Sequence, residues 1–592
     1  MSVYKHPYRD MEFVLQHLVD FDELCASADL QEINMELASV ILTEAGKLAT
    51  DVLAPLNKTG DLEGVTLTDK GVKEAPGFAD AFNLFREGGW ASLTGPEAFG
   101  GQELPNVLGA AASEVWQSSN LAFSLCYLLS SGAIEALHNH GSDELKAAYL
   151  PKMVSGEWAA TMNLTEPAAG SDLSAISTKA VAQGDHYLIR GQKIFISWGD
   201  HQMTDNIVHL VLARLPDAPA GVKGISLFVV PKFLPDASGN PGQANDLRCV
   251  SLEHKLGIHG SPTCVMSYGD GEGAIGYLVG EEHKGLHYMF TMMNNARQAV
   301  GLQGVAISER AYQQAREFAK ERIQGTNKDG SRFAIIKFPD VRRMLMQMKA
   351  SIEAMRALAF IAAADIDRCT YAKDSSSKMK YQARVDLLTP IVKGWSTELA
   401  QEVTYLATQI HGGMGFVEET GIAQHARDGR ILTIYEGTTG IQAMDFVGRK
   451  ILHNNGAYLS DLLEDIDATA AQLKTETRFG DIADSLIEAV ALGNEAKQWL
   501  LDNAPAKPDT AGGVSVQFLM TFGYICGAWV MARTMIKAQG MLDSGEAEAE
   551  FLESKLLTAK FYFEQILPRA KSGFEAVKAG AETFMALNEE QF

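Results

Sequence analysis

A change in residue pattern near position 159 most constrains what this chain can fold into. The runs "HYLIRGQKIFIS", "NIVHLVLARL" and "ISLFVVPKF" are short, rich in β-branched and aromatic residues, and separated by Gly, Asp and Pro. Outside this region apolar residues recur at helical spacing, for example in "INMELASVILTEAGKLATDVLAPLN". The pattern predicts a compact β domain inside an otherwise helical chain.

The same pattern divides the chain into four predicted domains and indicates an α+β multidomain fold class. We expect an N-terminal helical domain over 1–158, a middle β domain over 159–280, a C-terminal helical domain over 281–455 and an additional helical domain over 456–592. A chain of 592 residues is long enough for three or four domains of ordinary size. The additional region carries amphipathic stretches such as "EFLESKLLTAKFYFEQIL", whose apolar faces must be buried against something.

Charge and cysteine usage narrow the classes of function. The net charge of −23 argues against nucleic acid or an anionic membrane surface as the main partner. The six cysteines are scattered without a C-x-x-C pair, so neither a disulfide scaffold nor a metal site is predicted. The start, "MSVYKHPYRDMEFV", has no apolar core of a signal peptide, and we expect a cytoplasmic protein.

One apolar stretch, "VSVQFLMTFGYICGAWVMA" (514–532), approaches the length of a membrane span. It contains a Gln, two Gly and hydroxyl residues, and it lies between polar helical segments. We interpret it as a buried core helix, with a membrane span as the alternative, and expect no transmembrane segment.

Two segments of the β region offer groups that suit a flat ligand. In "MNLTEPAAGSD" (162–172), Thr165 and Ser171 supply hydroxyls at a strand exit, and Gly170 lets the backbone approach a ligand. In "KIFISWGD", Phe195 and Ser197 occupy alternate strand positions and hence one face. Each also has an ordinary structural interpretation, a plain turn for the first and a core Phe with a surface Ser for the second.

Three helical segments carry further candidates. "QIHGGMGF" (409–416) can bring backbone N–H groups to a phosphate, and "NNARQAVG" (294–301) opens a long helix with Arg297, which suits either a ligand or a salt bridge. In "RILTIYEGTTG" (430–440), Glu436 follows an apolar run. It is either a solvated residue before Gly437 or a base in a dry pocket, because burying a carboxylate is costly unless something uses it.

Taken together, these segments resemble motifs of the acyl-CoA dehydrogenase family. "GGWASLTGPEAFGG", "LTEPAAGSD", "KIFISWG", "NNARQAVG", "KERIQG", "QIHGGMGF" and "ILTIYEGTTGIQ" occur in the family's order and spacing over about residues 35–450. The resemblance implies the family's fold: an N-terminal helical domain, a middle β domain and a C-terminal four-helix-bundle-type domain. The length and the additional helical domain resemble the larger, roughly 65 kDa members.

The resemblance also implies roles for single residues. Glu436 matches the catalytic base, and FAD is the implied cofactor. The residues matching FAD contacts are Met162, Leu164, Thr165, Phe195, Ser197, Arg322, Gln409, Gly413 and Thr438. Of these, Arg322, Gln409 and Gly413 match residues that reach the FAD of a neighbouring subunit. The residues matching substrate contacts are Ser171, Asn294, Arg297 and Gly437, although Asn294 stands where many members have Asp, and Phe195 where many have Trp.

The implied reaction is the conversion of an acyl-CoA thioester to a trans-2-enoyl-CoA, with electrons passed to electron-transfer flavoprotein. The substrate is either a fatty acyl-CoA or 3-methylmercaptopropionyl-CoA, on which one bacterial subgroup with a start like "YKHPYRDMEFVL" acts. Two alternatives stay open: an acyl-CoA oxidase that uses oxygen, and a non-enzymatic flavin- or acyl-CoA-binding protein. We expect a homodimer in which the additional domain covers the surface that smaller, tetrameric relatives use for their second interface. The alternative is a tetramer that carries this domain as a separately folded appendage.

Overall fold

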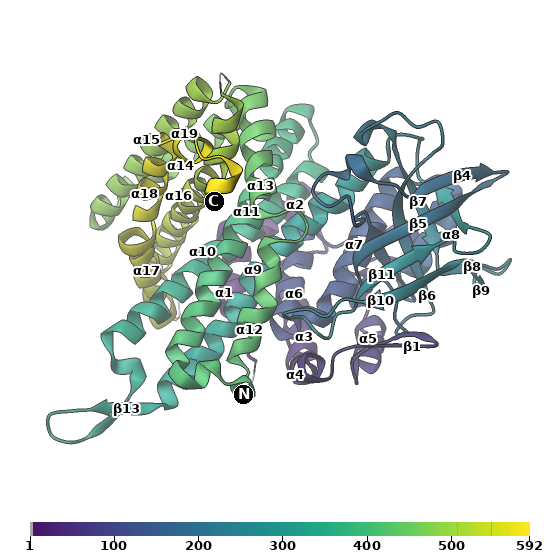
Figure 1. Cartoon of the computed structure of the whole chain (residues 1–592). Helices are drawn as coiled ribbons and strands as arrows, with labels where there is room; N and C mark the ends of the chain where they lie inside the picture. The colour runs from purple at the N-terminus through teal and green to yellow at the C-terminus, as the bar shows by residue number, and fades with distance from the viewer. Residues whose placement is uncertain (1–3, 506, 546–547) are drawn as a thin grey trace. The chain divides into compact units, whose positions relative to one another are not determined.

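The computed structural model describes residues 4–505, 507–545 and 548–592, which form two compact units (Figure 1). Unit 1 consists of the described residues up to Thr43, of Asn106–Glu114 and of Arg297–Phe592. Unit 2 consists of Glu44–Pro105 and Val115–Ala296. The four domain boundaries expected above stay predictions.

Unit 2 is built on an eight-stranded sheet in the region where β-strands were predicted. The strand order is β10-β11-β5-β12-β7-β6-β3, and β4 pairs with both β5 and β6. β3 and β6 are parallel, whereas the other neighbours in this order are antiparallel. The strands are β3 Trp158–Asn163, β4 Lys179–Gln183, β5 His186–Ser197, β6 Asn206–Arg214, β7 Ile225–Pro231, β10 Leu247–Leu252, β11 Thr263–Tyr268 and β12 Ala274–Leu278.

The apolar runs of this sheet explain its position in the core. Every residue of β7 is buried, and in β6 only Arg214 is not. Such continuous apolar runs occur where a strand is covered on both faces. Helix α7, Leu121–His140, packs against β3. The other main helices of this unit are α4 Ala54–Glu63, α5 Phe78–Glu87 and α8 Asp143–Val154, whose N-cap Ser142 accepts a hydrogen bond from Leu145 N.

Unit 1 is helical and closely packed around α11, Ser375–His411. Gly301 and Gly304 of α9 face Val392 and Ser396 of α11, where an added Cβ would lie 2.7 Å from a backbone oxygen. Only glycine permits this approach of two helix backbones. The other α-helices between α9 and the additional region are α10 Pro339–Thr370, α12 Ile422–Gly429 and α13 Thr439–Met444.

The additional C-terminal region is helical, as predicted, and its longest helix covers the preceding ones. Helix α16, Pro508–Ser544, packs against α10, α11 and α13 (Figure 1). A Cβ added at Gly523 of α16 would lie 2.3 Å from the Trp395 ring of α11. The remaining helices of the region are α14 Ala457–Thr475, α15 Gly480–Asn503, α17 Ala549–Phe561, α18 Pro568–Lys578 and α19 Glu582–Met585.

Two helices of the described residues are long and apolar enough to cross a membrane, α7 and Asp509–Ser544 of α16. The share of the most apolar window that is buried inside the protein is 78% for α7 and 83% for Asp509–Ser544. Helices at the centre of a packed domain have this character, which agrees with the interpretation of 514–532 as a core helix.

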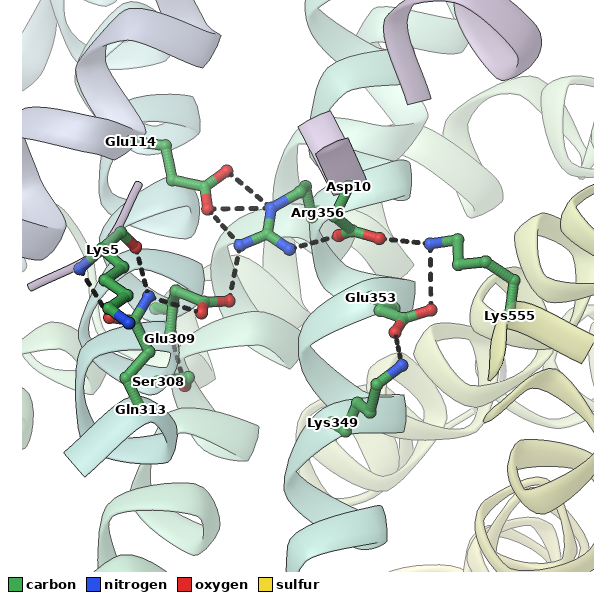
Figure 2. Close-up of polar contacts among 11 residues, drawn as sticks. Lys5, Asp10, Glu114, Ser308, Glu309, Gln313, Lys349, Glu353, Arg356 and Lys555 are labelled. Atoms are coloured by element: carbon green, nitrogen blue, oxygen red, sulfur yellow. Dashed lines mark hydrogen bonds and ion pairs between the residues drawn. The ribbon is translucent and has the colours of Figure 1, made fainter. Parts of the chain in front are cut away.

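A buried ionic network joins the N-terminal helix α1, Tyr8–Phe13, to the additional region (Figure 2). Asp10 of α1 forms ion pairs with Arg356 of α10 and with Lys555 of α17. Nη2 of Arg356 lies 2.6 Å from Oε1 of Glu114 and 2.8 Å from Oε2 of Glu309. Since all these side chains belong to unit 1, the network fastens α1 and α17 to α10 within that unit.

One expected helix start is wrong. The helix that contains "NNARQAVG" is α9, Gly285–Glu321, so Arg297 lies inside it and not near its beginning. The preceding segment continues the helix because it contains no Pro and buries Tyr288, Met289 and Met292 at helical spacing. Arg297 is therefore placed by helix packing and not by a helix N-terminus.

Candidate active site

Glu436 lies in a strained turn between a 3₁₀ segment, Arg430–Thr433, and helix α13. Its φ is 57° and that of Gly437 is 87°, so two consecutive residues have left-handed backbone conformation. For a non-glycine residue this conformation costs of order 1–3 kcal/mol and persists only where the surroundings enforce it. The strain makes Glu436 a functional candidate independently of any motif.

Two buried side chains hold this turn by its carbonyl oxygens. Nζ of Lys393, from α11, donates to Gly437 O at 2.7 Å. Nε2 of Gln442, from α13, donates to Glu436 O at 3.2 Å and to Gly437 O at 3.4 Å. Thr438 caps α13 by accepting a hydrogen bond from Ile441 N, which ends the turn. Hydrogen bonds thus hold three successive residues, Glu436, Gly437 and Thr438.

The surroundings of Glu436 bring the pKa of its carboxyl group close to neutral pH. Burial raises the pKa of Glu436 to about 7, and the positive charges of Arg297 and Lys393 oppose this rise. Arg297 is itself buried, and its Nη1 lies 3.4 Å from Oδ2 of Asp445. A carboxylate with a pKa near the working pH can both accept a proton and release it again, as a general base must.

In unit 2, Glu166 and Lys193 organise the loop that follows β3. Both side chains are buried, and Nζ of Lys193 lies 2.8 Å from Oε1 of Glu166 and 3.0 Å from the carbonyl oxygen of Leu164. The remaining capacity of the carboxylate is filled by the backbone and hydroxyl groups of Ser177 and Thr178. Because every acceptor site is used, the loop containing Leu164 and its neighbour Thr165 has one defined conformation.

A β-bulge in β5 turns Phe195 outward. Lys193 pairs with Met266 of β11 but Ile196 pairs with Cys264, so two residues of β5 stand opposite one of β11. Phe195 has a φ of 59° and a side chain 59% exposed, while the next residue, Ile196, is buried. The expected regular alternation is broken at this point, yet Phe195 and Ser197 still flank the buried Ile196. Ile194 N donates to Thr165 O at 2.9 Å, which places Thr165 beside the bulge.

Some of the predicted residues lie close together within each unit, and others do not. In unit 2, Leu164 is buried, Met162, Thr165 and Ser197 are half-buried, and Ser171 and Asn294 are exposed. In unit 1, Glu436, Gly437 and Thr438 share one turn, and Arg297 lies within electrostatic range of Glu436. Arg322, Gln409 and Gly413 are exposed on the surface of unit 1.

Sequence reasoning missed Lys393, Gln442, Lys193 and Glu166. A signal was available for Lys393, which stands in the apolar run "TPIVKGW" of the region predicted to be helical. A lysine inside such a run is almost never fully buried unless it has a partner. Its partner lies 44 positions further along the chain, and periodicity does not indicate which residue that is.

Comparison with known sequences gives one family along nearly the whole chain. Residues 47–157, 161–270 and 283–452 match the N-terminal, middle and C-terminal domains of acyl-CoA dehydrogenases. Residues 462–588 match the "Acetyl-CoA dehydrogenase C-terminal like" family. The chain belongs to the acyl-CoA dehydrogenase family, in the group with an additional C-terminal helical domain, as the motifs predicted.

Two curated relatives extend over the full length. One is the 3-methylmercaptopropionyl-CoA dehydrogenase of Ruegeria pomeroyi, which is 47% identical and covers 95% of this chain and 96% of its own. Another is the broad-specificity linear acyl-CoA dehydrogenase FadE5 of Mycobacterium tuberculosis, 34% identical with full coverage of both chains. This degree of likeness supports the enzyme class, an oxidoreductase of the acyl-CoA dehydrogenase type.

Two solved structures share the fold. The Caenorhabditis elegans protein ACDH-11, in complex with C11-CoA, has a TM-score of 0.77 and 20% identity over 95% of this chain and 92% of its own. An acyl-CoA dehydrogenase of Bacillus anthracis, complexed with FAD, has a TM-score of 0.72 and 20% identity over 92% and 89%. They confirm the predicted fold class, including the additional helical region.

Acyl-CoA dehydrogenases are FAD-dependent enzymes, and unit 2 fits such a cofactor. The exposed ring of Phe195 offers a flat apolar surface. Two hydroxyl residues are near it in the chain fold: Ser197 ends β5, and Thr165, in the loop after β3, is bonded through its carbonyl oxygen to Ile194 of β5. A flavin ring is flat, with a polar edge, and needs this combination of an apolar face and hydrogen-bonding groups. An exposed Phe on a bulged strand is otherwise an unfavourable arrangement.

Proposed function

We propose that Glu436 is the catalytic base of this acyl-CoA dehydrogenase and that 3-methylmercaptopropionyl-CoA is its substrate. The observation that carries the first part is the strained, left-handed Glu436 with a pKa of about 7, held between Arg297 and Lys393. The second part is supported by the 47% identity to the Ruegeria pomeroyi enzyme, which has that name.

In the proposed mechanism, the Glu436 carboxylate takes a proton from C2 of the acyl thioester. Such a proton is weakly acidic, so the negative charge that develops on the thioester oxygen has to be stabilised. The backbone N–H of Glu436 donates to this oxygen, and Arg297 keeps the surroundings positive. FAD, when bound, supplies the redox chemistry by accepting the hydride that leaves C3. Gly437 leaves room for the thioester next to the base.

The remaining residues serve to bind the two ligands. When FAD is bound, Thr165, with the backbone of Met162 and Leu164, would hold the polar edge of the flavin, and Phe195 and Ser197 would contact its ring. Thr438 would add a contact to FAD, and Ser171 and Asn294 would bind the CoA part of the substrate. Arg322, Gln409 and Gly413 are exposed on unit 1, which suits contacts to the FAD of a second subunit.

The electron acceptor proposed here is electron-transfer flavoprotein, and the compartment is the cytoplasm. The family relationship supports this acceptor over molecular oxygen. A turnover assay with and without an added electron acceptor separates the two, because an oxidase would form peroxide without one.

The protein is further proposed to be a homodimer. Its domain boundaries are proposed to lie near residues 158, 280 and 455. The packing of α16 on α10, α11 and α13 supports this assembly, since it covers helices within the chain itself. Light scattering of the full-length protein measures the mass, and a stable mass of four chains at micromolar concentration would contradict the dimer.

The base is tested by Glu436→Gln, with Glu464→Gln on the exposed face of α14 as a matched control. The amide fills the same space but cannot accept the proton, and loss of a general base lowers kcat by about 10²–10⁴-fold. FAD content and ligand binding should be retained, and the control should behave as wild type. A Glu436→Gln variant with more than a tenth of the wild-type kcat would place the base elsewhere.

The substrate is tested by an anaerobic flavin-bleaching panel. It compares 3-methylmercaptopropionyl-CoA with butyryl-, octanoyl- and palmitoyl-CoA at equal concentrations. The proposal expects the sulfur-containing thioester to give the highest kcat/KM. Pocket contacts with one methylene group change discrimination by only about 1–3 kcal/mol, so the complete series is needed. A linear fatty acyl-CoA with a higher kcat/KM would reject the sulfur-containing substrate while leaving the enzyme class intact.

A further inference from the structure

Lys393 is a buried charge next to the proposed base. Its side chain has no exposed surface, and its Nζ donates to the carbonyl oxygen of Gly437, the residue after Glu436. Moving a lysine out of water costs several kcal/mol unless its charge is used. One hydrogen bond to a carbonyl oxygen does not by itself explain why a charged side chain is buried here.

A neutral donor already serves the turn. Gln442 donates to the carbonyl oxygens of both Glu436 and Gly437. If holding the turn were the only requirement at Lys393, a second amide or hydroxyl group would meet it without burying a charge. The positive charge itself is therefore the distinguishing feature of this position.

The charged groups around Lys393 show where its charge acts. Arg297 faces it from α9, Glu398 lies one helical turn further along α11, and Glu436 comes from the turn before α13. Glu398 is already engaged, because its Oε1 accepts a hydrogen bond from Thr439 at 2.6 Å. Arg297 is shared with Asp445. Burial lowers the pKa of Lys393 to about 8, against the opposing effect of Glu436, so the ammonium form prevails at neutral pH.

The helix that carries Lys393 also packs against the additional C-terminal region. Gly394 faces Leu519 of α16, where an added Cβ would lie 2.9 Å from the leucine side chain. Trp395 packs against Gly523 and Gly527 of the same helix. Since α16 presents apolar groups to this part of α11, the ammonium group is directed toward the turn at Glu436.

We propose that Lys393 is a positioning residue, which fixes the left-handed turn at Glu436 through the Gly437 carbonyl and whose positive charge favours the ionised form of the Glu436 carboxylate. This inference rests on the proposed function, in which Glu436 is the base. The chemical step that Lys393 supports is the transfer of the C2 proton to Glu436, and Lys393 itself neither gains nor loses a proton in that step.

The test measures the base without the redox reaction. Acetyl-CoA has no C3 hydrogen to lose, so exchange of its C2 hydrogens with D₂O by the FAD-loaded enzyme reports on proton transfer to Glu436 alone. The exchange rate is followed by mass spectrometry from about pD 5.5 to 9, together with the pH profile of kcat/KM for the best substrate of the panel. Both profiles are expected to fall on the acid side as Glu436 becomes protonated.

Lys393→Met removes the charge and the donor at similar length, and Lys393→Gln removes the charge but keeps a donor. Lys393→Arg keeps the charge. A nearby opposite charge lowers a carboxyl pKa by about 1–3 units. In the Met and Gln variants, the pH at which the rate falls on the acid side should therefore rise by about that amount. It should stay near the wild-type value in the Arg variant. Lys450→Met is the matched control, because Lys450 is also largely buried but pairs with Asp386 at 3.0 Å.

The inference would be overturned if the pH at which the rate falls on the acid side is the same in the Met and Gln variants as in the wild type. This holds whatever the maximal rate of the variants is. Failure of both variants to fold with FAD would also overturn it, since Lys393 would then serve the fold alone. The Glu436→Gln variant tests the assignment of Glu436 as the base separately from the role of Lys393. If it still catalyses exchange, the assignment of the base is wrong. If Glu436→Gln is inactive and the rate of Lys393→Met falls at the same acid pH as that of the wild type, only the role of Lys393 is wrong.

Discussion

Replacing Arg356 with Met should destabilise the protein strongly, and more so at higher pH. The guanidinium group is 1% exposed and contacts three carboxylates, from Glu114, Glu309 and Asp10 (Figure 2). Met fills a similar volume but offers neither charge nor hydrogen bonds. Removing one partner of a buried ion pair costs about 3–5 kcal/mol because the other partner stays buried and unpaired.

The pH dependence follows from Glu114. Burial raises the pKa of Glu114 to about 7, and Arg356 opposes that rise. Without Arg356 the folded-state pKa moves higher still, while the unfolded-state value stays ordinary. A carboxyl group with a raised folded-state pKa binds its proton more tightly in the native state, so stability falls as pH rises toward that pKa. In the wild type this fall ends near pH 7, but in the variant it continues, by up to ~1.4 kcal/mol per pH unit.

Urea unfolding followed by circular dichroism, with FAD in excess, measures this difference at pH 6, 7 and 8. Arg343→Met is the control, because its pair with Asp340 is largely exposed and should contribute only a small fraction of the effect. A double variant, Arg356→Met with Glu114→Gln, should recover part of the loss by removing an unpaired carboxylate. A cost below about 1 kcal/mol at pH 8, or one that is the same at pH 6 and pH 8, would refute the reasoning.

Three further predictions concern the site and its support. For the wild type, the pKa of about 7 for Glu436 predicts that kcat/KM falls about tenfold per pH unit below neutrality, and a flat profile from pH 5.5 to 8 would contradict it. Lys193→Met leaves Glu166 buried without its cation and should raise the Kd for FAD by about tenfold or more, about 1.4 kcal/mol, in a fluorescence titration; Lys179→Met, on the exposed face of β4, is the control. Gly523→Val places methyl groups against the Trp395 ring and should cost about 1–3 kcal/mol or more in the same urea assay. Gly540→Ala, on the same helix and with no described atom within 4 Å of the added Cβ, should be neutral or stabilising, and equal effects of the two changes would show that packing on α11 is not the cause.

Local patterns in the sequence predicted much of this architecture. Short runs rich in β-branched and aromatic residues, separated by Gly, Asp and Pro, located the strands between about 159 and 280, and helical periodicity located the helical regions on either side. These signals are local because side chains repeat every two residues in a strand and every 3.6 in a helix. The same local reach explains the error at α9, where no start signal marks Gly285 and the motif at 294–301 was placed at the helix start.

The motif "YEGTTG" by itself determined which carboxylate to consider, but only the tertiary structure decided its environment. The left-handed backbone of Glu436, the bulge at Phe195 and the buried cation of Lys393 all depend on partners from other elements. Lys193 meets Glu166 across 27 positions, and Lys393 meets Gly437 across 44. Strain and burial of charge are tolerated only where packing supplies such partners, and packing is a property of the folded chain as a whole. The sequence therefore determined the family and the reactive group, whereas the fold decided how that group is held and charged.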